Sequence, residues 1–352
     1  MHNLSIPFLV ITMLITACAA PNTSRINYDS NELDAEVAIQ RELALKKYLG
    51  YKQRLYTVSY PILKSASQFC PNKQINSAGA QGASSSEFQD GWRVTAEKLL
   101  GSDNFVITWV DKNGPAAKAG LKFKDKVIAI NDVPFDASPI KNNKFYTEIA
   151  RTQTSESPQV KLTAQREGEL VNLIIQQEKI CGYPAVLSES DAVNAYADGK
   201  RIIITKGMMR FAQDDQDLAL VIAHELGHNL MGHIDKKQSN RMLGTLLDLA
   251  ASANGINTQG MFGSAGASAF SQDFEAEADY VALYYMSVAG LPLEGVADFW
   301  RDMAAEHPSN IGSNHSASHP ATSERFLAIS KTIEEINRKI AAGEPVKPNL
   351  ID

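Results

Sequence analysis

Residues 224–228 read His-Glu-Leu-Gly-His, and this stretch decides how the rest of the chain is interpreted. Apolar residues around it recur at helical spacing after Asp214 or Asp215, which predicts a helix. Because residues four apart share one face of a helix, His224 and His228 can offer imidazole nitrogens to the same metal ion. Glu225 follows the first histidine, where its carboxylate can take a proton from a water on that metal. The stretch therefore predicts a catalytic zinc site with Glu225 as the general base.

A third metal ligand is expected from an acidic stretch further along the chain. Residues 274–279 read Phe-Glu-Ala-Glu-Ala-Asp, again in a helical pattern, with Glu275 lying 47 residues beyond His228. Glu275 and Asp279 are four apart and share a helix face. We expect Glu275 to bind the zinc ion and Asp279 to hydrogen-bond a ligating imidazole and fix its tautomer. The alternative is that these acids form a solvated helix face.

Four features between residues 181 and 340 resemble metallopeptidase family forty-eight, the HtpX and CAAX-prenyl-protease group of gluzincins. They are Asn194-Ala195-Tyr196, the H-E-x-x-H motif, the E-x-x-x-D pair, and His319-Pro320 followed by Arg325. The resemblance implies that His224, His228 and Glu275 bind one zinc ion per chain. It also implies that His319 and Arg325 stabilise the oxyanion or gate the metal, and that His319 can occupy the fourth zinc position. The chain lacks the membrane spans of the HtpX branch and is closer to the periplasmic, lipoprotein-like branch.

Two further expectations concern the surroundings of the zinc site. His233 follows His228 by five residues, about 500° around a continuing helix, so we expect it to face away from the metal. We therefore expect a structural role, or a contact with a ligand, and not metal binding by His233 itself. Gluzincins commonly hold an extended peptide against an edge strand beside the zinc. The candidate is a predicted strand formed by Arg201, Ile202, Ile203, Ile204 and Thr205. Such backbone pairing needs an unfolded stretch of substrate, which predicts unfolded or misfolded proteins as substrates.

A β-rich unit precedes the zinc-binding part. Residues 105–110 and 126–130 have strand composition, and between them lies Gly114-Pro115-Ala116-Ala117-Lys118-Ala119-Gly120-Leu121. The order of these elements resembles a bacterial PDZ domain. That resemblance implies a groove that binds a peptide or a protein C-terminus by strand addition. Residues 99–104 are the candidate loop for the terminal carboxylate. The alternative is a PDZ fold used only as a rigid spacer.

The predicted fold class is α+β, with a mainly helical gluzincin domain, a small active-site sheet and a β-rich PDZ domain. Residues 31–70 are predicted as one or two amphipathic helices that pack on the protease domain, interrupted at Gly50 and Pro61. Residues 244–270 are rich in Gly, Ala and Ser and are predicted to be a mobile segment. The expected order is a signal peptide (1–17), a tether (18–30), the helices (31–70), a linker (71–87), the PDZ domain (88–178), the metallopeptidase domain (179–341) and a tail (342–352).

The N-terminus resembles the export signal of bacterial lipoproteins. An apolar run at residues 6–16 is followed by Ala17 and Cys18. The resemblance implies acylation of Cys18, and Ala19 after it fits sorting to the outer membrane. The alternative is an ordinary signal peptide in which Cys18 is incidental.

Two cysteines remain once Cys18 is acylated. Cys70 and Cys181 can form a disulfide in an oxidising compartment, closing a loop of about 110 residues. The alternative is two buried free thiols.

Composition limits the classes of partner. The chain has 34 basic and 40 acidic residues, a net charge of −6, and this balance gives no support for nucleic-acid binding. The sequence predicts a lipid-anchored periplasmic zinc endopeptidase in which zinc-bound water, assisted by Glu225, hydrolyses misfolded envelope proteins, and in which the PDZ domain recruits substrate or regulates access. The alternative is a peptide-binding or chaperone lipoprotein centred on the PDZ domain, with a latent zinc site.

Overall fold

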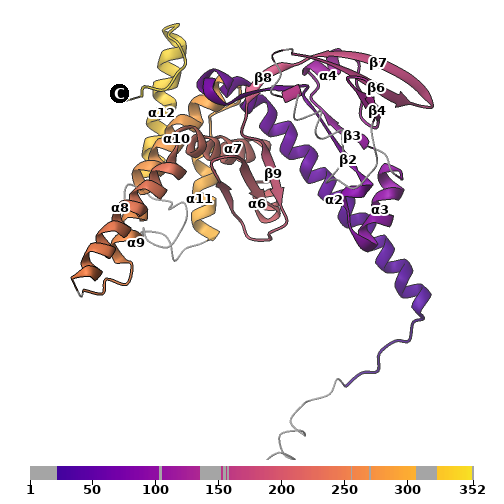
Figure 1. Cartoon of the computed structure of the whole chain (residues 1–352), viewed down its shortest axis with the longest axis horizontal. Helices are drawn as coiled ribbons and strands as arrows, with labels where there is room; N and C mark the ends of the chain where they lie inside the picture. The colour runs from indigo at the N-terminus through magenta and orange to yellow at the C-terminus, as the bar shows by residue number, and fades with distance from the viewer. Residues whose placement is uncertain are drawn as a thin grey trace, which may run out of the picture. The chain divides into compact units, whose positions relative to one another are not determined.

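The computed structural model describes residues 22–102, 105–134, 152–153, 156, 158–254, 256–268, 271–306 and 323–350. It separates into two units, Met1–Leu43 and Ala44–Asp352. The chain is a mixture of helices and sheets, so the predicted α+β class is confirmed (Figure 1). Cys18 and the predicted signal peptide lie outside the described residues. Within the described residues, no helix is both long enough and apolar enough to cross a membrane.

The first long helix is continuous where an interruption was expected. Helix α2 (Ser30–Ser65) runs through Gly50 and through Pro61, and the 3-10 helix η1 (Ala66–Phe69) follows it. Its last turns bury an apolar set, and such packing stabilises a helix more than local propensity does. Pro61 removes only the hydrogen bond of its own missing N–H, and the packing of the neighbouring buried residues offsets that loss. The buried apolar residues of this segment are Leu45, Leu55, Val58, Tyr60, Ile62 and Leu63.

Helix α2 is held by polar contacts to two other parts of the second unit. Trp109 Nε1 donates to Thr57 Oγ1 at 2.8 Å. Arg54 donates to the carbonyl oxygens of Met209 (3.2 Å) and Ala212 (2.7 Å), which belong to the segment before the zinc-motif helix. The half-buried Arg54 also pairs with exposed Asp215. The helix therefore contacts both the β-rich part and the helical part.

A six-stranded sheet forms the β-rich part. The strand order is β2-β3-β4-β6-β7, with β5 paired to β4, and every pairing is antiparallel. The two strands predicted at residues 105–110 and 126–130 are confirmed. The elements are β2 (Ala80–Ser84), α3 (Asp90–Leu100), β3 (Phe105–Val110), α4 (Pro115–Lys118), β4 (Lys126–Ile130), β5 (Val133–Pro134), β6 (Gln159–Arg166) and β7 (Glu169–Gln176).

The core of this sheet alternates along its strands, as in Val160, Leu162 and Ala164 of β6. Buried Asp125, at the start of β4, accepts hydrogen bonds from Arg166 Nε (2.7 Å) and Nη2 (2.6 Å), which ties β4 to the end of β6.

The prediction of a linker at residues 71–87 is wrong. Strand β1 (Gln74–Ser77) pairs with β8 (Glu178–Cys181), and β2 becomes an edge strand of the large sheet. The small residues of this segment permit close approach: a Cβ at Gly82 would lie 2.2 Å from the ring of Phe105. The small residues that suggested a linker are therefore needed for the close packing of strand β2. A 3-10 turn, η3 (Ser85–Glu87), closes the segment with a capping box in which Glu87 accepts from Ser84 N.

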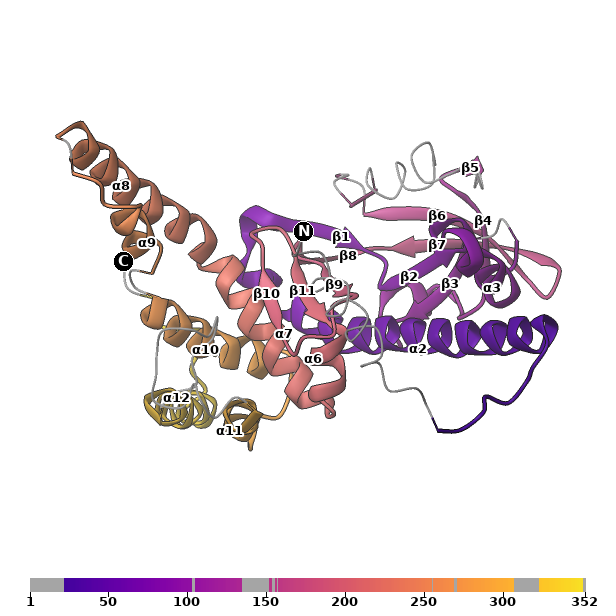
Figure 2. The same cartoon turned by 90° about the horizontal axis from the view of Figure 1, so that it is seen from below.

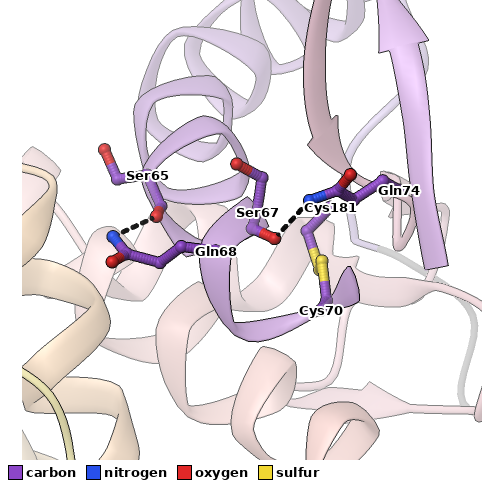
Figure 3. The surroundings of a disulfide bond; sticks show 6 residues. All are labelled: Ser65, Ser67, Gln68, Cys70, Gln74 and Cys181. Carbon is purple, nitrogen blue, oxygen red and sulfur yellow. Dashed lines mark hydrogen bonds between the residues drawn. A yellow bond between two sulfur atoms is a disulfide. The ribbon is translucent and has the colours of Figure 1, made fainter. Parts of the chain in front are cut away.

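Cys70 and Cys181 are bonded to each other, with their Cα atoms 5.9 Å apart (Figure 3). The bond joins the end of η1 to the end of β8, beside the β1–β8 pair. Gln74 Nε2 donates to Ser67 O at 2.8 Å, and Gly182 N donates to Lys73 O at 2.6 Å across the same junction. The link therefore fastens the N-terminal helix to the beginning of the helical part.

Replacing both cysteines by serine (Cys70→Ser with Cys181→Ser) should lower the free energy of unfolding by about 4–5 kcal/mol. The reason is that a bond between residues 111 positions apart removes much of the loop entropy of the unfolded chain. Denaturant titration of the oxidised protein and of the double variant measures this difference. Equal midpoints for the two proteins would show that the bond does not constrain the unfolded chain.

The helical part contains a three-stranded sheet. Its strand order is β10-β11-β9, with β11 (Ile202–Thr205) antiparallel to β10 (Ala195–Ala197) and parallel to β9 (Ala185–Ser188). Helices α6 (Lys206–Phe211) and α7 (Asp215–Leu230) pack against this sheet. The other helices of this part are α8 (His233–Ala253), α9 (Met261–Ser268), α10 (Ser271–Val288), α11 (Val296–Glu306) and α12 (Ser323–Ala341). Helix α10 packs against α7 and α12 (Figure 1).

Candidate metal centre

The metal centre is built by the close approach of α7 and α10. A Cβ at Gly227 would lie 2.9 Å from Val281 Cγ2 and 3.1 Å from Ala278 O, so only glycine lets α10 come this near. The approach carries Glu275 to the face of α7 that presents His224 and His228.

The ligand atoms of these three buried residues all lie within 4.8 Å of one another. His224 Nε2 is 3.2 Å from Glu275 Oε2, and His228 Nε2 is 3.3 Å from Glu275 Oε1. The two Nε2 atoms are 3.1 Å apart. Two imidazole nitrogens and a carboxylate are the donor set of catalytic zinc sites, so the residues fit the metal that the sequence predicts.

The opposite nitrogen of His224 is fixed by a buried carboxylate. His224 Nδ1 lies 2.9 Å from Asp279 Oδ1, and a carboxylate in that place accepts the Nδ1 proton and leaves the Nε2 lone pair for a metal. Arg325 of α12 donates to Asp279 through Nη2 at 2.8 Å and through Nε. The guanidinium also stacks over the ring of Trp300, 3.8 Å from its centroid. Asp279 is therefore positioned as the sequence predicted.

These charges set the ionisation of the buried groups. Burial raises the pKa of Asp279, but Arg325 and His224 outweigh that effect and hold the pKa below its ordinary value. Burial lowers the pKa of His224, but its hydrogen bonds to the Asp279 and Glu275 carboxylates and their negative charges outweigh burial and raise this pKa to about 9. A metal ion must therefore displace a proton from His224 when it binds.

His233 contacts a predicted metal ligand, which is one of the two roles expected for it, but the direction expected for its side chain is wrong. Helix α7 ends at Leu230, Gly232 takes a left-handed φ of +67°, and α8 begins at His233, so the angle expected for one continuous helix does not apply. His233 Nδ1 lies 2.8 Å from His228 Nδ1, and its Nε2 lies 2.6 Å from Glu277 Oε2.

Glu277, His233 and His228 form a hydrogen-bonded chain. With Glu277 accepting from Nε2, the Nδ1 of neutral His233 accepts the Nδ1 proton of His228, which leaves the Nε2 of His228 for the metal. Burial is the main reason that the pKa of His233 falls to about 4, which keeps the ring neutral. The His233 ring also stacks on the ring of Phe274, with 4.5 Å between the two ring centroids. The sequence offered one signal for this contact, a third acidic residue, Glu277, two positions after Glu275.

Replacing His233 by leucine (His233→Leu) should weaken zinc binding by about 10- to 100-fold, because His228 Nδ1 loses the partner that orients its ring. The substitution keeps the buried volume, so thermal unfolding in the presence of chelator should change far less. Competition with a chelating dye measures the zinc affinity, with Asp235→Asn, on an exposed neighbour, as the matched control. An unchanged dissociation constant would leave His233 with a packing role only.

Glu225 is buried on α7, one residue after His224. Burial holds the pKa of His228 below its ordinary value, and the negative charges of Glu275 and Glu225 oppose that effect.

Arg325 does not lie as the resemblance implied. Its guanidinium is on the Nδ1 side of His224, 3.5 Å from that atom, and pairs with Asp279. It thus positions Asp279, a role different from the predicted contact with the oxyanion. His319 lies outside the described residues.

The substrate strand expected at Arg201, Ile202, Ile203, Ile204 and Thr205 is also placed wrongly. Strand β11 lies between β9 and β10, so both of its edges are already paired. Among the described strands, the outer edge of β10 pairs with no other strand. Asn229, next to His228, accepts from Gly199 N at 2.8 Å and donates to Arg201 O at 3.0 Å. This clamp joins the turn after β10 to the helix that carries the motif.

The comparisons with known proteins agree with this geometry. A model of peptidase family M48 matches residues 158–333, half of the chain, so the chain belongs to that family. The mitochondrial metalloendopeptidase OMA1 of Saccharomyces cerevisiae is 29% identical over 148 residues, which are 40% of this chain and 43% of that protein. The metalloprotease LoiP of Escherichia coli is 33% identical over 142 residues, 38% of this chain and 56% of LoiP. The chain thus spans about half the length of these relatives.

One solved structure resembles a shorter part. The HtrA-type protease AlgW with tripeptide is 21% identical and covers 30% of this chain and 32% of that one, with a TM-score of 0.22. A match of this size carries no argument about the fold.

Proposed function

We propose that this chain is a zinc-dependent endopeptidase whose metal is held by His224, His228 and Glu275. The observation that carries the proposal is the convergence of these three buried groups from α7 and α10, with Glu225 one residue from the first ligand. The nitrogens on the far side of both imidazoles are hydrogen-bonded, which orients the rings before a metal arrives. Membership in family M48 and the metalloprotease names of OMA1 and LoiP support the same reaction class.

Each residue has a part in peptide hydrolysis. A bound zinc ion supplies the Lewis acidity that polarises the scissile carbonyl and acidifies the attacking water. Glu225 takes the proton of that water and passes it to the leaving amine. Asp279 and the His233–Glu277 pair hold the two imidazoles in place during this transfer. Burial of Glu225 keeps bulk water away from the proton that it carries.

We propose that the substrate pairs with the outer edge of β10. This strand contains Ala195 and Tyr196, and the Asn229 clamp holds its turn on the motif helix. Only an extended chain can add to a strand edge, so unfolded or misfolded proteins are the expected substrates.

Cleavage of casein by the zinc-loaded full chain tests the reaction. Casein, an unfolded protein, should be cut, chelation should stop the reaction, and added zinc should restore it. Ribonuclease A offers a matched pair, because its reduced, unfolded form should be cut and its native form should resist. If the zinc-loaded protein cuts neither casein nor reduced ribonuclease A, the endopeptidase proposal fails.

A second function, peptide capture by the sheet of β2 to β7, is favoured by a cavity of about 170 Å³ beside the edge strand β2. Residues of β2, the apolar core and Thr152 with Gln153 line it. We propose that this part is a PDZ domain and that the cavity receives a peptide C-terminus. The carboxylate loop is then better placed just before β2 than at residues 99–104, because Asn76, Ser77 and Ala78 line the cavity and Leu99 and Leu100 belong to α3.

A fluorescent peptide with a free C-terminus should bind this groove more tightly than the same peptide with an amidated terminus. Equal binding of the two peptides would contradict a carboxylate site. If Glu225→Gln leaves the function in cells intact while peptide binding persists, capture and not cleavage is the function of the protein.

We also propose that the chain is tethered by an acyl group on Cys18 and faces the periplasm. The export signal, with Ala19 after Cys18, supports the outer membrane as its location. Radiolabelled palmitate should be incorporated by the native chain and not by Cys18→Ser. Equal labelling of the two would place the acyl group elsewhere.

A further inference from the structure

Helices α8 and α9 form a hairpin that exposes many apolar side chains. The hairpin overlaps residues 244–270, the segment predicted to be mobile. The two helices lie side by side (Figure 2) and pack closely at glycines, since a Cβ at Gly244 would lie 1.9 Å from Phe262 O and one at Gly266 would lie 2.2 Å from Asn240 O. Eight large apolar side chains nevertheless remain 37–62% exposed: Met242, Leu243, Leu246, Leu247, Leu249, Ile256, Met261 and Phe262. So many exposed apolar side chains on two adjoining helices indicate an interaction surface.

The charges of the hairpin indicate what covers this patch. Between residues 242 and 270 the sequence has a single charged side chain, Asp248. Its carboxylate accepts from Phe262 N at 3.2 Å, from Gly263 N at 2.8 Å and from Thr258 Oγ1, so the charge is turned into the hairpin. The preceding turns of α8 instead carry three basic residues, Lys236, Lys237 and Arg241, against one acid, Asp235.

We infer that the tip of the α8–α9 hairpin inserts into the surface of a lipid bilayer with anionic headgroups. The apolar residues of α8 spread over about 160° of the helix, broader than the stripe with which a helix fits a protein groove. A broad apolar surface with basic residues beside it and no exposed charge within it matches the boundary between headgroups and acyl chains. The hairpin does not span the bilayer, because no described helix is long and apolar enough. Insertion would hold the metal centre near the membrane independently of any acyl group.

Vesicle flotation tests the inference on the full chain carrying Cys18→Ser, so that no acyl group contributes. The protein should float with vesicles of phosphatidylethanolamine and phosphatidylglycerol. Adding Leu246→Ser and Leu247→Ser should reduce the partition coefficient about 30-fold, because two exposed leucines no longer leave water. The matched control is Leu170→Ser with Ile174→Ser, which removes two equally exposed apolar residues from β7 and should bind like the parent.

A local probe gives a second measurement. Met261→Cys, labelled with bimane in the Cys18→Ser chain, should shift its emission to the blue when vesicles are added. Casein cleavage should be the same for the parent and for Leu246→Ser with Leu247→Ser, since neither leucine belongs to the metal centre.

Failure of the parent to float, or equal flotation of both double variants, would overturn the inference. A parent that self-associates through these leucines without binding vesicles would identify a second copy as the occupant. If the parent does not bind vesicles but Leu246→Ser with Leu247→Ser abolishes casein cleavage, the occupant of the apolar surface is unfolded substrate.

Discussion

Replacing Glu225 by glutamine (Glu225→Gln) should lower kcat for casein cleavage by about 10³-fold, in the middle of the range that general bases contribute. Glutamine has nearly the same shape but cannot accept the proton of the attacking water at neutral pH. The three metal-binding groups lie on other residues, so zinc content should stay at the value of the native chain. Initial rates of casein cleavage, measured with zinc content on the same samples, check both statements.

The control variant is Asp235→Asn, which also removes one carboxylate close to the motif, at an exposed position. It should keep the native rate. A Glu225→Gln protein that retains zinc and cuts within tenfold of the native rate would remove Glu225 from the role of base. Loss of zinc from that variant would instead make Glu225 part of the metal-binding set.

Arg325 should contribute strongly to the stability of the fold. The pair of Arg325 and Asp279 is almost completely buried, and Arg325→Leu would leave the Asp279 carboxylate with His224 as its charged partner. Removing one member of a buried pair typically costs about 3–5 kcal/mol, because the remaining charge stays out of water. Denaturant titration in the presence of chelator measures this loss without a contribution from metal binding.

The exposed pair of Lys331 and Glu334 on the same helix gives a matched control, with its atoms 2.7 Å apart. Lys331→Leu should change the free energy of unfolding by less than about 1 kcal/mol, because exposed pairs are screened by water. Adding Asp279→Leu to Arg325→Leu should recover part of the stability, since no buried charge then remains. Equal effects of Arg325→Leu and Lys331→Leu would show that the buried pair is not a stabilising feature.

Much of the metal centre could be predicted from the sequence because it depends on local geometry. His224 and His228, and likewise Glu275 and Asp279, are four residues apart on helices, and that spacing alone puts each pair on one face. The strands of the six-stranded sheet were predictable for a similar reason, as the alternation of Val160, Leu162 and Ala164 shows.

The errors arose where the structure depends on distant contacts. The composition of a strand does not determine its position in a sheet, so the predicted edge position of β11 is wrong and the strand is central. Residues 71–87 pair with strands far along the chain, and their small side chains gave no apolar alternation. The direction expected for His233 is wrong because the helix breaks at Gly232, whose left-handed backbone turns α8 back toward Glu277.

The central claim is that α7 and α10 together hold one zinc ion through His224, His228 and Glu275. Diffraction from crystals grown with zinc, recorded on both sides of the zinc absorption edge, tests it most directly. We expect a single strong anomalous peak bounded by the Nε2 atoms of His224 and His228 and by the carboxylate of Glu275, at ligand distances of about 2.0–2.2 Å. No peak there, or a peak whose ligands exclude Glu275, would contradict the account.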